Sequence, residues 1–374
     1  MFLQTLSLQG FRNLPPQHLS FHPQTNFIFG ANAQGKTNLL ESIYFVCLTK
    51  SFRTHEERDC LTKNHDQFIL QAVFEDERRV EQQLQIQYIR DSGKKILLNN
   101  KPVYSTSTLI GQFPVVKLSR EDQEITAGSP QHRRRFCNIL LSQVAAAYLQ
   151  TLKEYERVLL QRNRILQNFF RGRGEDQSAC DLWTEQLVHK AQKLFEMRRQ
   201  LVEDLNPLLA ECYRRFNKGE PLQICYQPNV GETAGQSFAT VFWQRLRACR
   251  QQEQKQGTTL LGPHRDEFVF FIAKKELRKF GSRGEHKSAL ISLKAAEVAL
   301  IRNRLDTWPI ILLDDLYAEL DLERAQGALN HYPKELQRFV TGTSFDYPLL
   351  QPLLDQDNWV WWMKEGRADR AKTL

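Results

Sequence analysis

Residues 30–37 read Gly30-Ala31-Asn32-Ala33-Gln34-Gly35-Lys36-Thr37, and this stretch decides the fold. Its spacing, G-x-x-x-x-G-K-T, is that of a phosphate-binding loop. The apolar run at 26–29 is typical of a strand, and residues 38–45 carry apolar side chains at helical spacing. A strand, a glycine-bounded loop and a helix form the context that such a loop requires. The alternative, on these eight residues alone, is a glycine turn before an ordinary helix.

The residue types in the loop suit a nucleoside triphosphate. Gly30 and Gly35 let the backbone turn and bring its N–H groups toward phosphate oxygens, and the N-terminus of the next helix adds partial positive charge. Lys36 is expected to reach the β- and γ-phosphates, and the Thr37 hydroxyl to bind Mg²⁺. The sequence therefore predicts that residues 30–37 bind ATP with Mg²⁺.

A second stretch, residues 309–315, is an apolar run that ends in two carboxylates. A central strand of a parallel sheet buried on both faces has this pattern. Its carboxyl end would lie beside the phosphate loop, so Asp314 is expected to hold Mg²⁺ through water. Asp315 would face the γ-phosphate side and orient or deprotonate an attacking water, which makes it the predicted catalytic residue. Taken alone, the stretch would indicate only a buried strand followed by an acidic turn.

Composition limits the class of protein. The 374 residues leave room for two domains, and 41% hydrophobic with 25% charged residues is typical of a soluble globular protein. The chain has no apolar run of membrane-spanning length and no signal-peptide pattern at its start. Its seven cysteines are scattered without a C-x-x-C pair, which argues against a zinc site or a disulfide framework. We expect a cytoplasmic protein with reduced thiols and no membrane partner.

The pattern of elements indicates two halves separated by an insertion. Short strands are expected at 68–74, 84–89 and 95–98, followed by helices over 133–170 and 182–205 that form a helical hairpin. Strand patterns resume at 258–266 and 268–272. The predicted domains are an N-terminal half-head at 1–127, a helical lobe at 128–256 and a C-terminal half-head at 257–374.

A glycine-serine loop at 280–288 precedes a clean helical pattern. Such a loop at a helix N-terminus offers a second anion site. The alternative is plain N-capping of the helix by Ser282.

Together, the phosphate loop, the helical insertion, the S-x-G-x helix start and the D-D strand followed by Glu319-Leu320-Asp321 resemble the ABC-type ATPases of the SMC class. Further matching stretches lie at 11–13, 127–130, 133–136 and 261–266. The resemblance implies an α/β fold, an ABC-type ATPase head with a P-loop and a mixed sheet. It also implies that the inserted α-helical lobe replaces a longer SMC-type arm.

The resemblance also implies an ATP-dependent head-to-head homodimer. Outside the loop, it assigns to a signature, which acts in trans on the other subunit's nucleotide, the residues Ser282, Gly284, Glu285 and Lys287. It assigns Thr341 and Thr343 to a γ-phosphate sensor. It also makes Arg12 a contact of the nucleotide. The loop at 318–321 would cross the dimer interface. The segment 119–123 stands about where a glutamine loop belongs.

Two positions depart from the pattern of the class. Glu285 replaces the usual glutamine of S-x-G-Q, and a carboxylate near a triphosphate is repulsive unless Lys287 or another cation offsets it. Ala318 stands where a serine is usual. The expected activity is that of a weak, DNA-stimulated ATPase acting as a switch.

The lobe carries a basic stripe. Residues 131–175 contain nine Lys/Arg and three acids, a balance of 9 − 3 = +6, within a chain of net charge +8. Arg157, Arg164 and Arg171 are seven apart and would share one helix face, which suits a phosphate backbone read without sequence preference. The alternative is a solvated helix face.

These features favour an ATP-switched DNA clamp of recombinational repair and replication restart, part of the SOS response. The resemblance implies binding to duplex DNA and to junctions at gaps, with slow hydrolysis as a release timer. Recombination mediator proteins would be its partners in loading recombinase. Two alternatives use the same loop: a kinase acting on a small molecule, which would need an acceptor pocket, and the ATPase subunit of a transporter.

Overall fold

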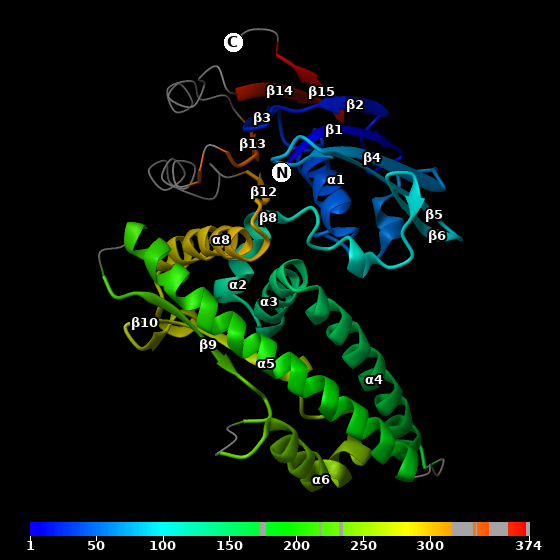
Figure 1. Ribbon diagram of the computed structural model, residues 1–374, viewed down its shortest axis with the longest axis vertical. Helices are drawn as coiled ribbons and strands as arrows, with labels where there is room; N and C mark the ends of the chain where they lie inside the picture. Colours follow the sequence, from blue (N-terminus) through cyan, green and yellow to red (C-terminus); the bar gives the residue numbers. More distant parts are fainter. Residues whose placement is uncertain are drawn as a thin grey trace. The chain divides into compact units, whose positions relative to one another are not determined.

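The computed structural model describes residues 1–172, 177–216, 219–231, 235–315, 332–333, 335–343 and 358–371. The chain divides into two compact units (Figure 1). The first, here the sheet unit, comprises Met1–Gln123 and Leu290–Leu374, and the second, the helical unit, comprises Glu124–Ala289. Each unit is described by itself.

One sheet of the sheet unit is antiparallel. Its strands, in spatial order, are β2 (Gln17–Ser20), β1 (Phe2–Gln9), β4 (Gln67–Glu75), β5 (Glu81–Ile89), β6 (Gly93–Leu98) and β7 (Lys101–Pro102). Buried and more exposed positions alternate along β4, as expected of a strand with one face on a core. The strands predicted at 68–74, 84–89 and 95–98 are confirmed as β4, β5 and β6.

The other sheet carries the phosphate loop. Its spatial order is β15 (Arg367–Arg370), β14 (Asn358–Lys364), β3 (Thr25–Phe29), β13 (Arg338–Gly342), β12 (Ile310–Leu313) and β8 (Val115–Leu118). All neighbours run parallel except β15, and every residue of β3, β12 and β13 is buried. The mixed sheet of the predicted α/β fold is therefore confirmed, with the carboxyl ends of β3 and β12 at one edge.

Helices complete the sheet unit. The helix α1 (Lys36–Leu48) begins at the last two residues of the phosphate loop and is buried along most of its length. The helix α8 (Arg283–Leu305) contributes its part from Leu290 onward. Three single turns connect the strands: η1 (Glu57–Cys60), η2 (Thr106–Thr108) and η3 (Arg120–Asp122).

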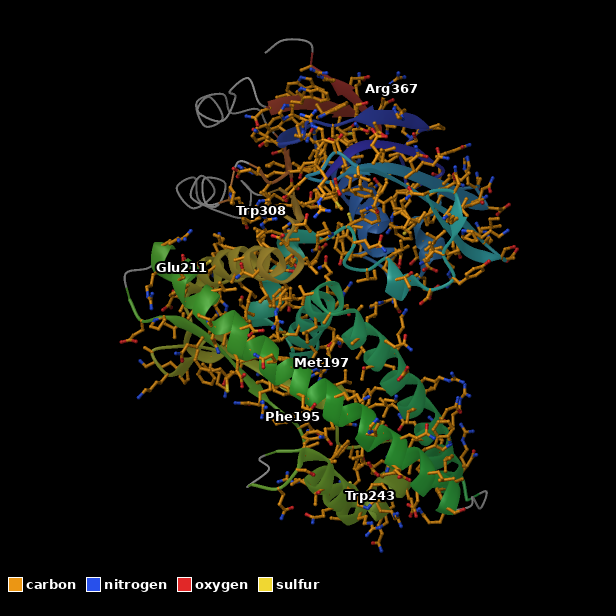
Figure 2. The ribbon with its side chains drawn as sticks, in the orientation of Figure 1. Phe195, Met197, Glu211, Trp243, Trp308 and Arg367 are labelled. Carbon is orange, nitrogen blue, oxygen red and sulfur yellow. The ribbon has the colours of Figure 1, made fainter. Side chains whose placement is uncertain are left out.

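The helical unit is dominated by two long helices, α4 (Ala146–Phe170) and α5 (Gln177–Phe216), which pack against each other as the predicted helical hairpin (Figure 1). Phe195 and Met197 lie midway along α5, and Glu211 lies near its end (Figure 2). The remaining elements are α2 (Gln123–Ala127), α3 (Pro130–Val144), β9 (Leu222–Gln227), α6 (Phe238–Gln256), η4 (Pro263–Arg265), β10 (Glu267–Ile272), β11 (Lys275–Glu276) and α7 (Leu277–Phe280).

A buried ion pair anchors the helical unit. Arg198 of α5 donates from Nη1 to Asp266 Oδ2 at 2.7 Å and to the carbonyl of Pro263 at 2.7 Å. The same carboxylate accepts from Tyr226 Oη at 2.5 Å and from the backbone N–H of Asn229 at 2.8 Å. Because each buried charge has several partners, the pair avoids the penalty of an unsatisfied interior charge.

Two predictions of local structure are wrong. The helix expected over 133–170 is broken at Ala145, whose φ of −147° and ψ of 96° are extended. The break sends Tyr148 into the core, where its Oη donates to Asn138 and accepts from Arg198. Residues 258–266 form no strand, because the glycine at 262 and the turn η4 carry the chain to Asp266 instead.

The boundary of the helical unit also differs from the predicted lobe at 128–256. The unit continues to Ala289 because β9, inside the predicted lobe, pairs antiparallel with β10, beyond its predicted end. Among the described residues, no helix has both the length and the apolar character needed to cross a membrane.

Candidate nucleotide-binding site

The phosphate loop connects β3 to α1 within the sheet unit. Gly35, at the N-cap of α1, has a φ of 103°, a left-handed conformation that favours glycine. Lys36 is buried, and its ammonium donates to the carbonyl oxygens of Gly30 at 2.7 Å and Ala31 at 3.0 Å. A buried ammonium needs such acceptors, and phosphate oxygens can take their place. The ammonium of Lys36 is thus bound to the first two residues of the loop in which it is predicted to bind phosphate.

Three side chains from distant parts of the sequence meet at the carboxyl edge of the parallel sheet. Thr37 Oγ1 donates to Asp314 at 2.9 Å from Oδ2 and 3.1 Å from Oδ1, across 277 positions of sequence. Thr341 Oγ1 donates to Asp314 Oδ1 at 2.8 Å. Burial raises the pKa of Asp314, and the two hydroxyl donors partly offset that rise. The structure therefore brings the predicted metal ligands Thr37 and Asp314 together.

Asp315 stands next to this cluster in a strained conformation. Its φ is +48°, and its backbone N–H donates to Thr341 Oγ1 at 2.9 Å. Its Oδ1 is buried and has no hydrogen-bond partner among the described residues. A non-glycine residue held left-handed with a free buried acceptor is typical of a functional position. An attacking water is one donor that would satisfy this oxygen.

The oxygen ligands at this edge fit Mg²⁺. No group of three or more His, Cys, Asp or Glu side chains able to hold a metal occurs in the part of the chain that the structure describes. A magnesium ion needs few protein ligands, because it keeps waters and binds substrate phosphates. One hydroxyl and one carboxylate, Thr37 and Asp314, supply the hard oxygens that such a site takes from protein.

Arg12 forms an ion pair with the buried carboxylate of Glu41. Its guanidinium donates to Glu41 of α1 from Nη2 at 2.6 Å and from Nε at 2.9 Å, and to the carbonyl of Asp59 at 2.5 Å. Glu41 is fully buried and also accepts from Ser51 Oγ at 2.5 Å. The described contacts of Arg12 therefore brace the helix of the phosphate loop, and its contact with nucleotide stays a prediction.

The predicted signature lies at the start of α8, in the helical unit. Glu285 accepts from the backbone N–H and from Oγ of Ser282, both at 2.8 Å, while its own N–H donates to Ser282 Oγ at 3.2 Å. This reciprocal arrangement is a capping box, and both hydrogen bonds from Ser282 lower the pKa of Glu285. Gly284 and Lys287 are half-buried in the first turns of the helix. The carboxylate that replaces the usual glutamine therefore caps the N-terminus of its own helix.

The predicted sensor residues differ in placement. Thr341 belongs to the Asp314 cluster, whereas Thr343 is exposed and has no hydrogen bond to a described residue. The segment 119–123 begins at the end of β8, where the backbone N–H of Asp314 donates to the carbonyl of Leu118 at 2.9 Å. The loop at 318–321 lies outside the described residues.

The basic stripe of the helical unit separates into two sets. Arg157 and Arg164 are exposed on α4, Arg171 is exposed at its C-cap, and none of the three forms an ion pair with a carboxylate among the described residues. Arg133 and Arg162 are buried instead and pair with Glu267 at 2.8 Å and Glu253 at 2.6 Å. These two arginines form buried ion pairs inside the helical unit. The charge count of residues 131–175 could not distinguish them from the exposed arginines.

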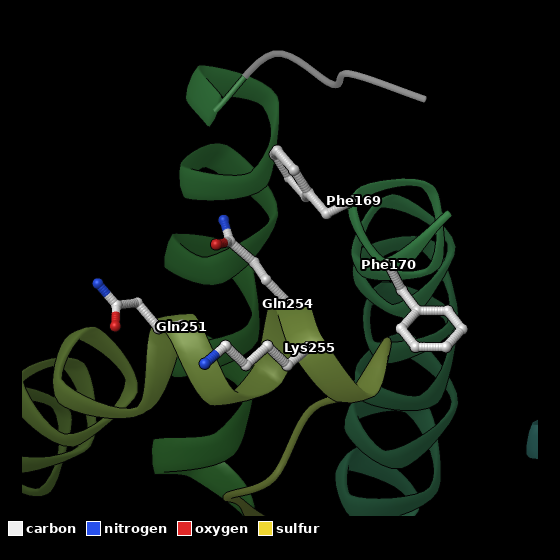
Figure 3. A pocket seen from close by; sticks show the side chains of 5 residues that line it. All are labelled: Phe169, Phe170, Gln251, Gln254 and Lys255. Carbon is white, nitrogen blue, oxygen red and sulfur yellow. The ribbon is translucent and has the colours of Figure 1, made fainter. Parts of the chain in front are cut away.

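A shallow hollow of about 450 Å³ lies where the end of α4 meets the end of α6 (Figure 3). Its lining combines two aromatic rings, two amides and one ammonium: Phe169, Phe170, Gln251, Gln254 and Lys255.

Two features of the nucleotide site were missed in the sequence. Glu41 follows no motif, although a carboxylate inside an apolar helical pattern can indicate a buried ion pair. The second is the contact of Gln34 with the turn between β14 and β15, where the backbone N–H groups of Glu365 and Gly366 donate to its side chain and carbonyl. No local pattern signals a contact across that distance of sequence.

Comparison with known proteins identifies relatives along nearly the whole chain. Residues 2–346 match the family model described as the RecF/RecN/SMC N terminal domain. The DNA replication and repair protein RecF of a Bacillus cereus strain is 36% identical over 350 residues, covering 92% of this chain and 93% of the relative. The RecF of Bacillus thuringiensis (strain Al Hakam) matches to the same extent.

Solved structures give the same result. The recombination mediator protein RecF with ATP, of the RecFOR pathway, superimposes with a TM-score of 0.90 and 26% identity, covering 99% of this chain and 97% of that one. An SMC head bound to the C-winged helix domain of ScpA matches with a TM-score of 0.55 at 16% identity, covering 99% and 97%, and shows the fold alone. The ABC-type head predicted from the sequence is confirmed.

Proposed function

The chain belongs to the RecF family of the RecF/RecN/SMC proteins, and we propose that it is an ATP-switched DNA clamp of replication and repair. In this proposal ATP joins two copies head to head, the joined copies hold DNA at gaps, and slow hydrolysis releases it. Family membership argues against the kinase and transporter alternatives.

One observation carries the proposal: Thr37 of the phosphate loop and Asp314 of the acidic strand share hydrogen bonds of 2.9 and 3.1 Å. A nucleotide site of this class needs a hydroxyl and a carboxylate within reach of one ion. The RecF relative of known structure was solved with ATP, which supports ATP as the nucleotide. When bound, Mg²⁺ would be held by Thr37 and Asp314 and would neutralise developing charge on the phosphates.

The chain's own residues would act in sequence. The loop amides and Lys36 bind the phosphates, and Lys36 exchanges its two carbonyl acceptors for phosphate oxygens. Asp315 orients the attacking water through the oxygen that has no other described partner. In a dimer, the helix start at Ser282 and Gly284 would face the nucleotide of the other copy.

Mass action explains the switch. A ligand bound between two subunits stabilises the dimer by its differential affinity for that state. Hydrolysis removes the γ-phosphate and with it the stabilisation, so a slow rate serves as a timer.

The exposed arginines of α4 and its C-cap support DNA as the partner. Arg157, Arg164 and Arg171 present three guanidiniums without described acidic partners, and such contacts bind phosphate backbones without reading sequence. The relative with ATP is described as a recombination mediator of the RecFOR pathway, which supports other mediator proteins as partners and recombinase loading as the outcome.

The test is sedimentation of wild type and Lys36→Met, with and without ATP and gapped DNA. The clamp requires ATP-dependent dimers in wild type and their loss in the variant. Wild type that remains monomeric at saturating ATP, with and without DNA, would refute the dimer switch.

A further inference from the structure

The β14–β15 hairpin, including its turn, lies directly against the phosphate loop. A Cβ added at Gly30 would come within 2.4 Å of the carbonyl oxygen of Met363, and one added at Gly35 within 3.3 Å of the Cα of Gly366. Gly30 does not have a positive φ, so contact rather than backbone conformation excludes a side chain there. Both glycines of the motif therefore border the hairpin, and Gly30 is required for that close approach.

Hydrogen bonds join the turn to Gln34, between the two glycines. The backbone N–H of Gly366 donates to the carbonyl of Gln34 at 2.9 Å, and the N–H of Glu365 donates to Gln34 Oε1 at 2.6 Å. Two hydrogen bonds thus hold the loop against a segment whose Gly366 lies 332 positions further along the sequence than Gln34 (366 − 34).

The turn itself is held from its other side by β2. Gln17 Nε2 donates to the carbonyl of Gly366 at 2.9 Å, and the N–H of Ala368 donates to Gln17 Oε1 at 3.0 Å. Gly366 has a φ of +83°, and a Cβ there would lie 2.3 Å from the carbonyl oxygen of Asn13. The side chain of Arg367 marks the start of β15 in Figure 2.

We propose that the β14–β15 hairpin, residues 358–370, is a positioning element that holds the phosphate loop in its binding conformation before nucleotide arrives. The loop must present its N–H groups in one direction, and ordering it at the moment of binding would cost conformational entropy. Gln34 transmits the rigidity of the hairpin to the loop, and Gln17 holds the hairpin in place. Neither side chain needs to touch the nucleotide for this role. The inference rests on the proposed binding of ATP to this loop.

The test compares three single variants and one double variant. Gln34→Met removes the side-chain acceptor at similar volume, and Gln17→Met frees the hairpin from a position outside the loop. Gln87→Met is the matched control, since Gln87 is also half-exposed and donates to the side chain of Gln67 on the antiparallel sheet. Affinity is measured by titration with a fluorescent ATP analogue and Mg²⁺, and loop rigidity by hydrogen exchange of amides 31–36 without nucleotide. Urea midpoints report the global stability.

Losing one hydrogen bond that orders the site should weaken nucleotide affinity about 3- to 10-fold in Gln34→Met. Gln17→Met should weaken it in the same direction, and the double variant should be less impaired than the product of the two effects, because both act through one turn. Exchange at 31–36 should accelerate in both single variants, while Gln87→Met should match wild type. If Gln34→Met does not fold, Gln17→Met alone decides.

Wild-type affinity and wild-type exchange in the hairpin variants would overturn the inference and leave ATP binding intact. A wild-type protein that binds no ATP would instead overturn the proposed function. A drop in the urea midpoint with unchanged affinity and loop exchange would show a merely structural hairpin, which also contradicts the inference.

Discussion

Replacing the three exposed arginines of α4 and its C-cap tests the predicted DNA surface quantitatively. Arg157 and Arg164 are seven residues apart on α4, where a straight helix drifts by about 20° per seven residues, so the two lie nearly on one line, and Arg171 follows seven residues later at the C-cap of the helix. Each is exposed and without a described acidic partner, so Arg→Gln at all three should leave the packing of the helical unit unchanged.

The expected magnitude follows from counterion release. If each guanidinium contacts one phosphate, three contacts contribute about 2.7 to the slope of log K against log salt, at about 0.9 per contact. Between about 50 and about 200 mM salt, wild-type affinity should therefore fall about 40-fold more than that of the triple variant. Binding should weaken to a similar degree on DNA of any sequence, because phosphate contacts carry no sequence information.

The assay is fluorescence anisotropy with labelled gapped DNA over that range of salt. The control removes three other exposed arginines from the same unit, Arg199, Arg214 and Arg215 on α5, for an equal change in charge. A triple variant with the wild-type slope, or a control with an equal loss of slope, would refute the assignment of this face to DNA.

Three further predictions address single side chains. Asp315→Asn should keep ATP binding but slow turnover about 100-fold or more, as measured by phosphate release, because the amide cannot accept a proton from water. Glu285→Gln should leave the unfolding free energy within ~0.5 kcal/mol, since glutamine also completes a capping box, while sedimentation should show a tighter ATP-dependent dimer. Burial lowers the pKa of His264 from 6.5 to about 4, so the unfolded state takes up its proton first as pH falls. The contribution of His264 to the free energy of unfolding should therefore be fully present above pH 6.5 and fall by about 3 kcal/mol toward pH 4. In urea unfolding, His264→Gln should lack this fall of about 3 kcal/mol.

The elements that the sequence predicted correctly are determined by residues within or next to them in the chain. The phosphate loop has an apolar strand before it and a helix after it, and β12 is a continuous apolar run ending in carboxylates. Strands β4 and β5 alternate as one-sided strands must. Because parallel strands end at one edge, the topology alone indicated that Thr37 and Asp314 would meet.

The features that the sequence did not reveal have causes far away in the chain. The break at Ala145 carries no glycine or proline, and its cause is the burial of Tyr148 against Arg198, 50 positions away. In the sequence Arg162 resembles its exposed neighbour Arg164, but it is a core residue because Glu253, Thr184 and Thr259, from other segments, bind its guanidinium. The hairpin contact with Gln34 joins segments that no local pattern relates.

The central claim is that Lys36, Thr37 and Asp314 gather around one magnesium nucleotide, and anomalous scattering from a crystal grown with ATP and Mn²⁺ tests it most directly. The account predicts a single manganese peak in contact with the Thr37 hydroxyl, with the Asp314 carboxylate beside it and the β- and γ-phosphates at Lys36. A manganese peak elsewhere, or a triphosphate bound away from Lys36, would contradict the account.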